Sequence, residues 1–290
     1  MKRYGDIRGD GGSNIVGQVE AQQARLAKQL ASVRFVLAVI SGKGGVGKSA
    51  VTANLAAALA RDGWRVAALD ADLNGPSLAK MLGARGATLT VGSDGVEPPV
   101  GAGGIPVMSM DLLLPDDDAP LAWHAPTAAE SHTWRGAMEA NALREFLADT
   151  HWGELDALVV DLPPGTDRLT VIAGVLPRLD GAVIVTIAPE VSQLIVRRSI
   201  TAVRDARAPI MGLVENMSGL FPGADAVGLA AHAGIPFLGR IPFDPELAAA
   251  ADRGTPFVTV APDAEAARAL TAIARRVRSR LEQATREPAK

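Results

Sequence analysis

The chain has 290 residues, of which 48% are hydrophobic, so it is long enough to bury one large core, and we predict a single domain. Its formal net charge is −3, and no long run of Lys or Arg offsets that balance. This charge pattern argues against a nucleic-acid-binding protein. Cysteine is absent, which excludes disulfides, thiolate nucleophiles and thiolate metal ligands within this chain.

The N-terminal stretch MKRYGDIRGDGG lacks the apolar segment of a signal peptide, and no apolar run reaches the roughly 18 residues of a membrane span. We therefore predict a cytoplasmic protein that does not associate with a membrane. Residues 1–33 are expected to form a segment that is flexible around Gly9 to Ser13 and then a helix. Four apolar residues at helical spacing indicate that this helix packs on the edge of the domain: Val19, Leu26, Leu30 and Val33.

The rest of the chain alternates short apolar runs with helical patterns. Continuous runs rich in Val, Ile or Ala predict strands covered on both faces, at 35–40, 65–69, 105–108, 157–160, 182–187, 210–214 and 237–238. Helical patterns between them span 49–61, 135–149, 191–207, 225–233, 245–253 and 263–283. This order predicts an α/β domain over residues 34–283, with a mostly parallel sheet covered by helices on both faces, and a tail at 284–290.

The first predicted strand runs into the loop SGKGGVGKS, which satisfies the phosphate-binding pattern G-x-x-x-x-G-K-[ST] and is followed at once by a helical pattern. Glycines let backbone N–H groups turn inward around an anion, and the helix N-terminus adds its dipole. Lys48 would neutralise β- and γ-phosphate charge, and Ser49 would offer a hydroxyl to Mg²⁺. The residues predicted to bind nucleotide here are Gly42, Lys43, Gly44, Gly45, Val46, Gly47, Lys48, Ser49 and Ala50.

A second lysine, Lys43, lies in the same loop, although the chain has only six lysines. The form KGGVGKS resembles the deviant phosphate-binding loop of a P-loop NTPase family that includes the nitrogenase iron protein, the positioning ATPases MinD and ParA, and the Mrp or ApbC type ATPases. In that family the extra lysine crosses a dimer interface to the nucleotide of the partner subunit. The resemblance therefore implies a homodimer in which Lys43 and Lys48 both take part in catalysis.

Further motifs narrow the resemblance to the Mrp type. DADLNGPS at 70–77 is similar to the first switch of that family, WRGAMEANALREFL to its WRGPM segment, LVVDLPPGT at 158–166 to its Walker B and second switch, and LVENMS to its adenine-side loop. The similarity runs from about residue 34 to residue 280. It implies that Asp72 positions or activates the attacking water and that Asp70 lies nearer the metal.

The residues themselves support this interpretation but leave alternatives open. Asp161 ends an apolar strand, where a carboxylate can hold a Mg²⁺-bound water, and the turn through Gly165 could sense the γ-phosphate. Asp161 could also be an ordinary strand-ending residue. Asp70 and Asp72 follow another strand, at the edge of a parallel sheet where ligands bind, although Asp72 could be a solvated turn residue.

The identity of the nucleotide follows from an absence. Guanine-binding relatives use a late N-K-x-D element, and the only lysine after Lys80 is Lys290, so we predict ATP with Mg²⁺. The resemblance places Asn216 at the adenine edge, with Pro242 and Asp244 flanking the base. Asn216 could instead cap a turn.

The sequence also departs from the Mrp type. Ala50 stands where that family usually has Thr, and GTGD is shortened to GTD at 165–167. An inserted stretch at 119–133 holds His124, Glu130 and His132; a metal site there is conceivable, but such loop residues are more often solvated. The CxxC with which two subunits of the family bridge an iron–sulfur cluster is missing, so no iron–sulfur cluster is expected.

The sequence thus predicts a Mg-ATP-binding switch. The resemblance implies that it forms a homodimer, hydrolyses ATP slowly and acts in metallocofactor assembly through an unidentified protein partner or client. The alternative is a positioning ATPase like MinD or ParA that cycles on and off a surface. An apolar stripe beside several arginines near the C-terminus suits an anionic membrane, but it suits a helix covering the sheet better: Leu270, Ile273, Val277 and Leu281.

Overall fold

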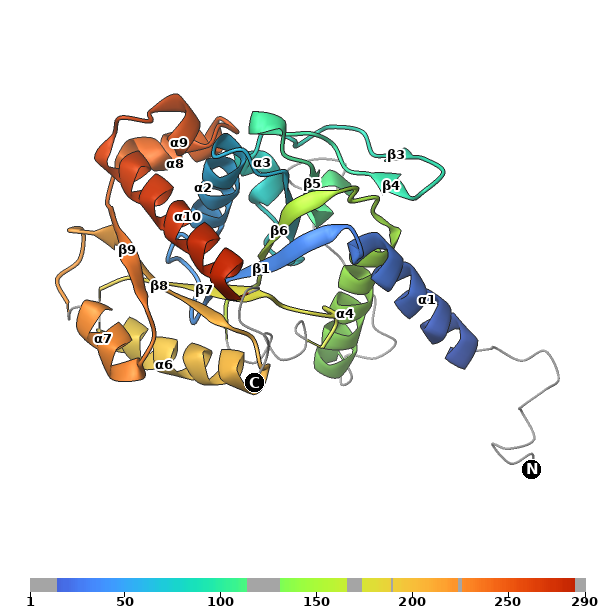
Figure 1. Ribbon diagram of the computed structural model, residues 1–290, viewed down its shortest axis with the longest axis horizontal. Helices are drawn as coiled ribbons and strands as arrows, with labels where there is room; N and C mark the ends of the chain where they lie inside the picture. The colour runs from blue at the N-terminus through green and yellow to red at the C-terminus, as the bar shows by residue number, and fades with distance from the viewer. Residues whose placement is uncertain (1–14, 114–130, 166–173, 189, 224–225, 285–290) are drawn as a thin grey trace.

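The computed structural model describes residues 15–113, 131–165, 174–188, 190–223 and 226–284, and its centre is a seven-stranded parallel sheet (Figure 1). The strands run in the order β5-β2-β6-β1-β7-β8-β9. They are β1 Val33–Ser41, β2 Val66–Asp70, β5 Val107–Met108, β6 Leu155–Asp161, β7 Gly181–Thr186, β8 Ile210–Ser218 and β9 Phe237–Pro242. Each overlaps a strand predicted from an apolar run, and the predicted fold class is confirmed.

Helices cover both faces of this sheet (Figure 1). One face carries α2 (Lys48–Arg61) and α10 (Glu265–Ala284), together with the shorter helices α3 (Leu78–Met81), α8 (Pro245–Asp252) and α9 (Phe257–Val260). The other carries α4 (Ser131–Asp149), α6 (Glu190–Asp205) and α7 (Ala226–Ala233). Strand β1 is buried on both sides because its alternate residues enter opposite cores, with Leu37 in one and Ala38 in the other.

Three short features were not predicted. Strands β3 (Thr90–Val91) and β4 (Val96–Glu97) form a separate antiparallel pair, and α3 and α9 are single turns. Two strand residues or four helix residues are too few to display a period of 2 or 3.6, so no sequence pattern marks them. Two 3₁₀ turns, Ala102–Gly104 and Met110–Leu113, flank β5.

The helix predicted within residues 1–33 is α1 (Ile15–Leu30), which packs along α4 (Figure 1). Leu26 and Leu30 are buried, and Arg25 pairs with Asp149 of α4. Val33, which the helical stripe included, is instead the first residue of β1, because the helix ends at Leu30 and the chain turns into the sheet. The predicted flexible residues Gly9 to Ser13 lie outside the described residues, as does all but the first residue of the predicted tail.

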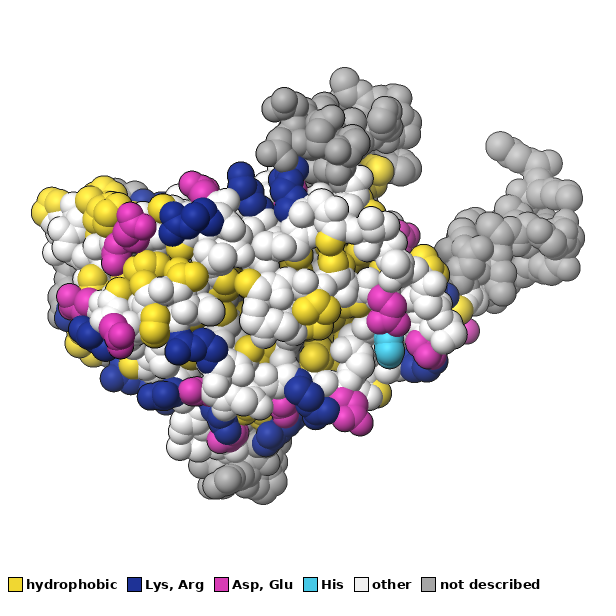
Figure 2. All heavy atoms as spheres, turned by 90° about the horizontal axis from the view of Figure 1, so that it is seen from above, with side chains coloured by type: hydrophobic (Ala, Val, Ile, Leu, Met, Phe, Trp, Pro, Cys, Tyr) yellow, Lys and Arg dark blue, Asp and Glu magenta, His cyan; other side chains and the backbone are white. Residues whose placement is uncertain are grey.

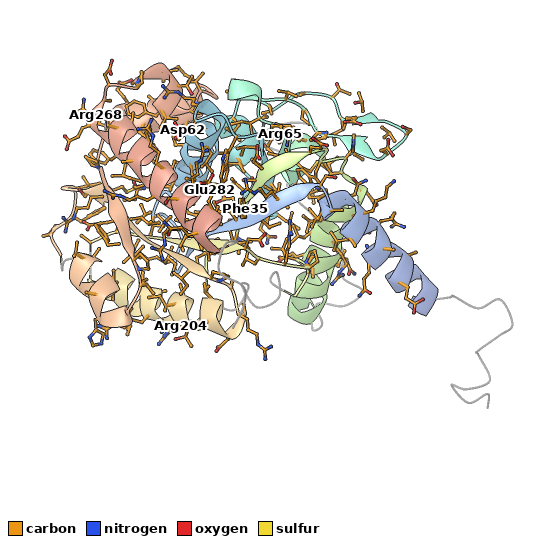
Figure 3. The ribbon with its side chains drawn as sticks, in the orientation of Figure 1. Phe35, Asp62, Arg65, Arg204, Arg268 and Glu282 are labelled. Carbon is orange, nitrogen blue, oxygen red and sulfur yellow. The ribbon has the colours of Figure 1, made fainter. Side chains whose placement is uncertain are left out.

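The stripe on the C-terminal helix is buried against the sheet. The side chains of Leu270, Ile273, Val277 and Leu281 are at most 2% exposed. Two arginines of the same helix bind the end of α2, where Arg275 pairs with Asp62 and Arg278 donates to the Asp62 carbonyl (Figure 3 labels Asp62). The apolar face of α10 is therefore already covered, which removes the feature that suited a membrane.

On the face seen in Figure 2, Lys and Arg side chains are interspersed with Asp and Glu side chains. Within the described part of the chain, none of the helices combines the length and the apolar character needed to cross a bilayer.

Candidate nucleotide-binding site

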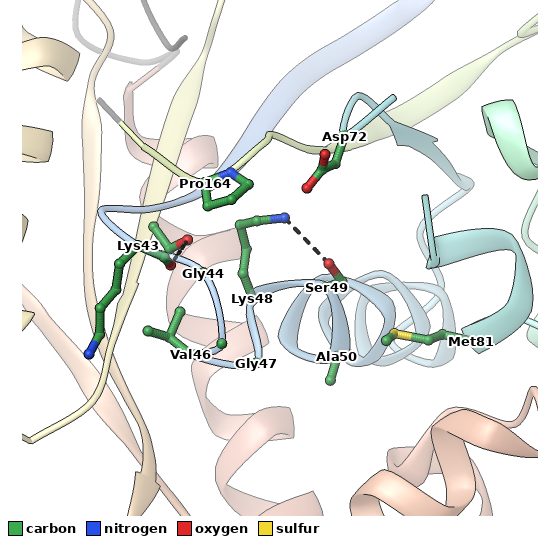
Figure 4. A pocket seen from close by; sticks show the side chains of 12 residues that line it. Lys43, Gly44, Val46, Gly47, Lys48, Ser49, Ala50, Asp72, Met81 and Pro164 are labelled. Atoms are coloured by element: carbon green, nitrogen blue, oxygen red, sulfur yellow. Dashed lines mark hydrogen bonds between the residues drawn. The ribbon is translucent and has the colours of Figure 1, made fainter. Parts of the chain in front are cut away.

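The loop between β1 and α2 is shaped by two glycines with left-handed backbone. Gly45 and Gly47 have φ of 77° and 75°, which L-residues with a Cβ adopt at a cost. Gly47 is the residue before α2, so the helix begins at Lys48 with its first N–H groups beside the loop. A cavity of about 230 Å³ opens over this loop (Figure 4), and its lining includes Lys43, Ser49, Asp72 and Pro164.

Three side chains of α2 converge on the carboxylate of Asp161, at the end of β6. Lys48 Nζ lies 2.7 Å from Asp161 Oδ2, and Ser49 Oγ donates to the same oxygen at 2.6 Å. Thr52 Oγ1 lies 2.6 Å from the other oxygen, Oδ1. The Asp161 side chain is fully buried, so these partners compensate for the desolvation of its charge. The sequence placed Lys48, Ser49 and Asp161 here, whereas Thr52 was missed because no pattern connects it with β6.

Asp70 ends β2 directly opposite Asp161 in the strand register. Its Oδ2 accepts hydrogen bonds from the backbone N–H groups of Ser77 and Leu78, both at 2.9 Å, and its Oδ1 accepts from the N–H of Asp72. The Ser109 hydroxyl lies 3.2 Å from Oδ2. Burial, and then the charge of Asp161, raise the pKa of Asp70 to about 7. In this arrangement Asp70 binds the backbone of the 71–78 loop. The expectation that Asp70 lies near the metal remains a prediction.

Asp72 and Lys43 lie at the cavity but differ in direction. Figure 4 shows the Asp72 carboxylate directed toward the space over Lys48 and Ser49, next to Pro164. The Lys43 side chain extends away from Lys48 (Figure 4). Gly165 does not line this cavity; its N–H donates to the Ser41 carbonyl at 3.1 Å, which fastens the turn after β6 to the end of β1.

A second cavity, of about 240 Å³, adjoins the first, with which it shares Gly47, Ala50 and Met81. It brings together Asn216, Pro242 and Asp244, the three residues predicted to lie around the base. Sequence reasoning missed the apolar residues that complete its wall: Met81, Met217, Phe243 and Leu247. Phe243 is 48% exposed. Its place in the sequence between the predicted residues Pro242 and Asp244 is the signal that could have found it.

Two polar side chains at the second cavity already have partners within the chain. Asn216 Nδ2 donates to the Val46 carbonyl at 2.8 Å, so this amide supports the phosphate-binding loop rather than capping a turn. Asp244 caps α8 by accepting from the Glu246 N–H at 3.0 Å. Most of the residues that line this cavity are apolar, as expected of a surface that receives the faces of a planar ring.

The donors at the first cavity suit Mg²⁺. The ion prefers oxygen ligands. The Ser49 hydroxyl lines this cavity and is in contact with the buried Asp161 carboxylate. No group of three or more His, Cys, Asp or Glu residues placed to hold a metal occurs among the residues described. His124 and Glu130 of the inserted stretch lie outside those residues, and His132 belongs to the first turn of α4.

These features together define a P-loop NTPase. A glycine loop joins a strand of a parallel sheet to a helix that begins with a lysine and a serine, and a carboxylate ends the neighbouring strand. The family model described as "ParA: NUBPL iron-transfer P-loop NTPase" matches residues 32–278. The chain belongs to this family, and the resemblance to Mrp-type ATPases is confirmed.

Several relatives carry names that describe a role in iron–sulfur metabolism. The chain is 41% identical over 272 residues to an iron–sulfur cluster carrier protein of Saccharolobus solfataricus, which covers 90% of this chain and 88% of the relative. It is 43% identical over 255 residues to one from Deinococcus radiodurans, with 85% and 69% covered. It is 39% identical over 266 residues to the cytosolic Fe-S cluster assembly factor NUBP2 of Bos taurus, with 86% and 94% covered.

Solved structures show the same architecture. A nucleotide-binding protein of Archaeoglobus fulgidus in complex with ADP superposes with a TM-score of 0.67 and 35% identity, over 80% of this chain and 90% of that one. The cell division ATPase MinD of Pyrococcus furiosus gives a TM-score of 0.64 at 21% identity, over 85% and 99%, and shares the fold. This chain differs from what the relatives' names suggest in one respect: with no cysteine, it has no thiolate ligands of its own for a cluster.

Proposed function

We propose that this chain is a Mg-ATP-dependent molecular switch that works as a homodimer and hydrolyses ATP slowly. The observation that carries the proposal is the cluster of Lys48 and Ser49 on Asp161, which lies under the same cavity into which Asp72 points. A cation, a hydroxyl and two carboxylates around a loop of backbone N–H groups are the parts that phosphoryl transfer requires.

In this proposal the loop N–H groups and Lys48 bind the β- and γ-phosphates, while Ser49 and Asp161 hold Mg²⁺ directly or through its water. The bound ion would neutralise charge that develops between these phosphates. Asp72 orients the attacking water, and Pro164 and Gly165 form the turn that responds to the γ-phosphate. Because Lys48 contacts Asp161 at 2.7 Å, we expect the lysine to exchange this carboxylate for phosphate oxygens when nucleotide binds.

The base fits the second cavity, between the apolar wall and the loop. The wall can stack on either face of a purine, and the ring would lie beside Asn216. We propose adenine because the chain has no N-K-x-D element with which to bind guanine.

The dimer is proposed from Lys43. Its side chain extends away from Lys48 of its own subunit (Figure 4), and among the described residues no carboxylate forms an ion pair with it. A cation in that position is available to a nucleotide held by a facing subunit. This arrangement would make hydrolysis depend on dimerisation.

For the cellular process we propose iron–sulfur metallocofactor assembly in the cytoplasm, with the cluster ligands on a partner protein. Family membership supports the process, and the name of the bovine relative supports the compartment. The missing thiolates support the placement of the cluster ligands on a partner protein, because cysteine sulfur is the principal ligand of such clusters.

Lysine substitutions test the proposal. Lys48→Ala should abolish binding of a fluorescent ATP analogue, because it removes the charge that faces the phosphates. Lys43→Ala should bind the analogue yet neither dimerise nor hydrolyse ATP, as followed by light scattering and phosphate release. Lys28→Ala on α1, which removes an exposed lysine paired only at the surface with Asp94, is the matched control. Equal loss of nucleotide binding in both loop variants would refute the role of Lys43 across subunits.

A further inference from the structure

Thr52 lies on α2, one turn beyond Lys48, and its side chain is fully buried. Residues 48, 49 and 52 are spaced to share the helix face that meets the end of β6. Lys48 and Ser49 both contact Asp161 Oδ2, whereas Thr52 alone of the three contacts Oδ1. The two oxygens of this carboxylate therefore have different partners.

The Thr52 hydroxyl has one hydrogen and two acceptors within reach. Asp161 Oδ1 is 2.6 Å away, and the Lys48 carbonyl is 3.0 Å away. The second contact is the ordinary bond of a helical threonine to the carbonyl four residues before it. The first is shorter, and an ionised acceptor strengthens a hydrogen bond about twofold. The hydrogen is therefore donated to Asp161.

We propose that Thr52 is a positioning residue that sets the affinity of the site for Mg²⁺. The χ2 torsion of an Asp side chain, which rotates the carboxylate about the Cβ–Cγ bond, has a broad distribution with no strong intrinsic preference. A fixed donor on Oδ1 holds this carboxylate so that Oδ2 faces Lys48 and Ser49, which line the cavity. This inference rests on the proposed binding of Mg-nucleotide, in which Ser49 and Asp161 hold the ion.

The test measures metal affinity separately from nucleotide affinity. A fluorescent ADP analogue is titrated into the protein in EDTA, and Mg²⁺ is then titrated into the complex. Thr52→Val removes the hydroxyl at nearly constant volume and should raise the Mg²⁺ concentration for half-maximal effect about tenfold, the scale of one hydrogen bond to a charged group. Affinity for the analogue in EDTA should change less than about twofold, since Thr52 does not touch the nucleotide in this proposal.

Two further variants separate the hydroxyl from packing. Thr52→Ser keeps the hydroxyl and should restore Mg²⁺ affinity nearly to the wild-type value, whereas Thr52→Ala, which differs from it by one oxygen, should not. This pair decides the question even if Thr52→Val does not fold. Thr271→Val is the matched control, because Thr271 makes the same bond to a carbonyl four residues earlier, on α10 and away from the site.

Unchanged Mg²⁺ affinity in Thr52→Val or Thr52→Ala would overturn the inference. So would equal weakening by Ser and Ala, which would assign the effect to the lost methyl group. A matching loss of nucleotide affinity in EDTA would show that Thr52 only maintains the loop. If the wild-type complex itself showed no response to Mg²⁺, the proposed function would fail and the inference with it, which is a distinct outcome.

Discussion

Gly45 and Gly47 offer a paired test of how the nucleotide loop is held. Both have left-handed backbone of nearly the same φ, but a Cβ on Gly45 would meet nothing within 4 Å. A Cβ on Gly47 would lie 2.4 Å from Asn216 Nδ2. Gly45→Ala should therefore cost only the backbone strain, about 1–2 kcal/mol of unfolding free energy. Gly47→Ala should cost that strain and more.

The additional cost follows from the bond that Asn216 makes. To admit a methyl group on residue 47, the Asn216 side chain must move and give up its bond to the Val46 carbonyl. Asn216 is 5% exposed, so the separated groups would lack water, at a cost of about 1–3 kcal/mol. We therefore expect Gly47→Ala to be less stable than Gly45→Ala by about that amount.

Urea unfolding of the nucleotide-free protein in EDTA, followed by circular dichroism, measures the difference. A double-mutant cycle then identifies its origin, because Asn216→Ala removes the atom nearest the added methyl group. The other close atom, Met217 Cε at 3.2 Å, is the end of a flexible side chain. In the Asn216→Ala background, the penalty of Gly47→Ala should fall to that of Gly45→Ala. Equal destabilisation by the two alanines, or a Gly47→Ala penalty that Asn216→Ala leaves unchanged, would refute this account of the loop.

Three further predictions concern the carboxylates and the missing thiolates. Asp72→Asn should bind Mg-ATP with little change yet slow phosphate release at least about tenfold and trap a dimer; unchanged turnover would make Asp72 a solvated loop residue. The pKa of Asp70 is raised from 3.8 to about 7, so the native state retains a proton that the unfolded state releases, and stability should fall as pH rises between these values. Asp70→Asn should flatten this fall in urea midpoints measured in EDTA, and parallel curves for the two proteins would contradict it. Anaerobic reconstitution with iron and sulfide should give no stable cluster absorption while ATP binding persists, and stoichiometric cluster binding would show that other side chains replace cysteine.

The phosphate-binding loop could be predicted because its determinants are local. A strand, glycines that permit left-handed backbone, a lysine, a serine and a helix follow one another within about twenty residues, and short-range geometry fixes what they form. The parallel sheet was equally accessible, because strands buried on both faces need continuous apolar runs. The elements that were missed, such as β3 and α3, are too short for their sequence to repeat a period.

The partners of these local features could not be predicted, because they come from distant parts of the chain. Thr52 meets Asp161 across 109 residues, and Asn216 meets Val46 across 170. Polar residues in a sequence do not specify which distant group will satisfy them, so Asp70 could be placed at the site but not recognised as the anchor of its own loop.

The C-terminal helix shows the same division. Its apolar stripe and arginines were compatible with a membrane or with the sheet. An amphipathic pattern indicates that one face of a helix is covered, but it does not identify what covers that face. Packing on the sheet and the Arg275–Asp62 pair decided between them. By itself the sequence determined the fold class, the loop and the lack of thiolates; the tertiary structure decided which side chains meet at the loop, since contact between distant residues depends on how the whole sheet assembles.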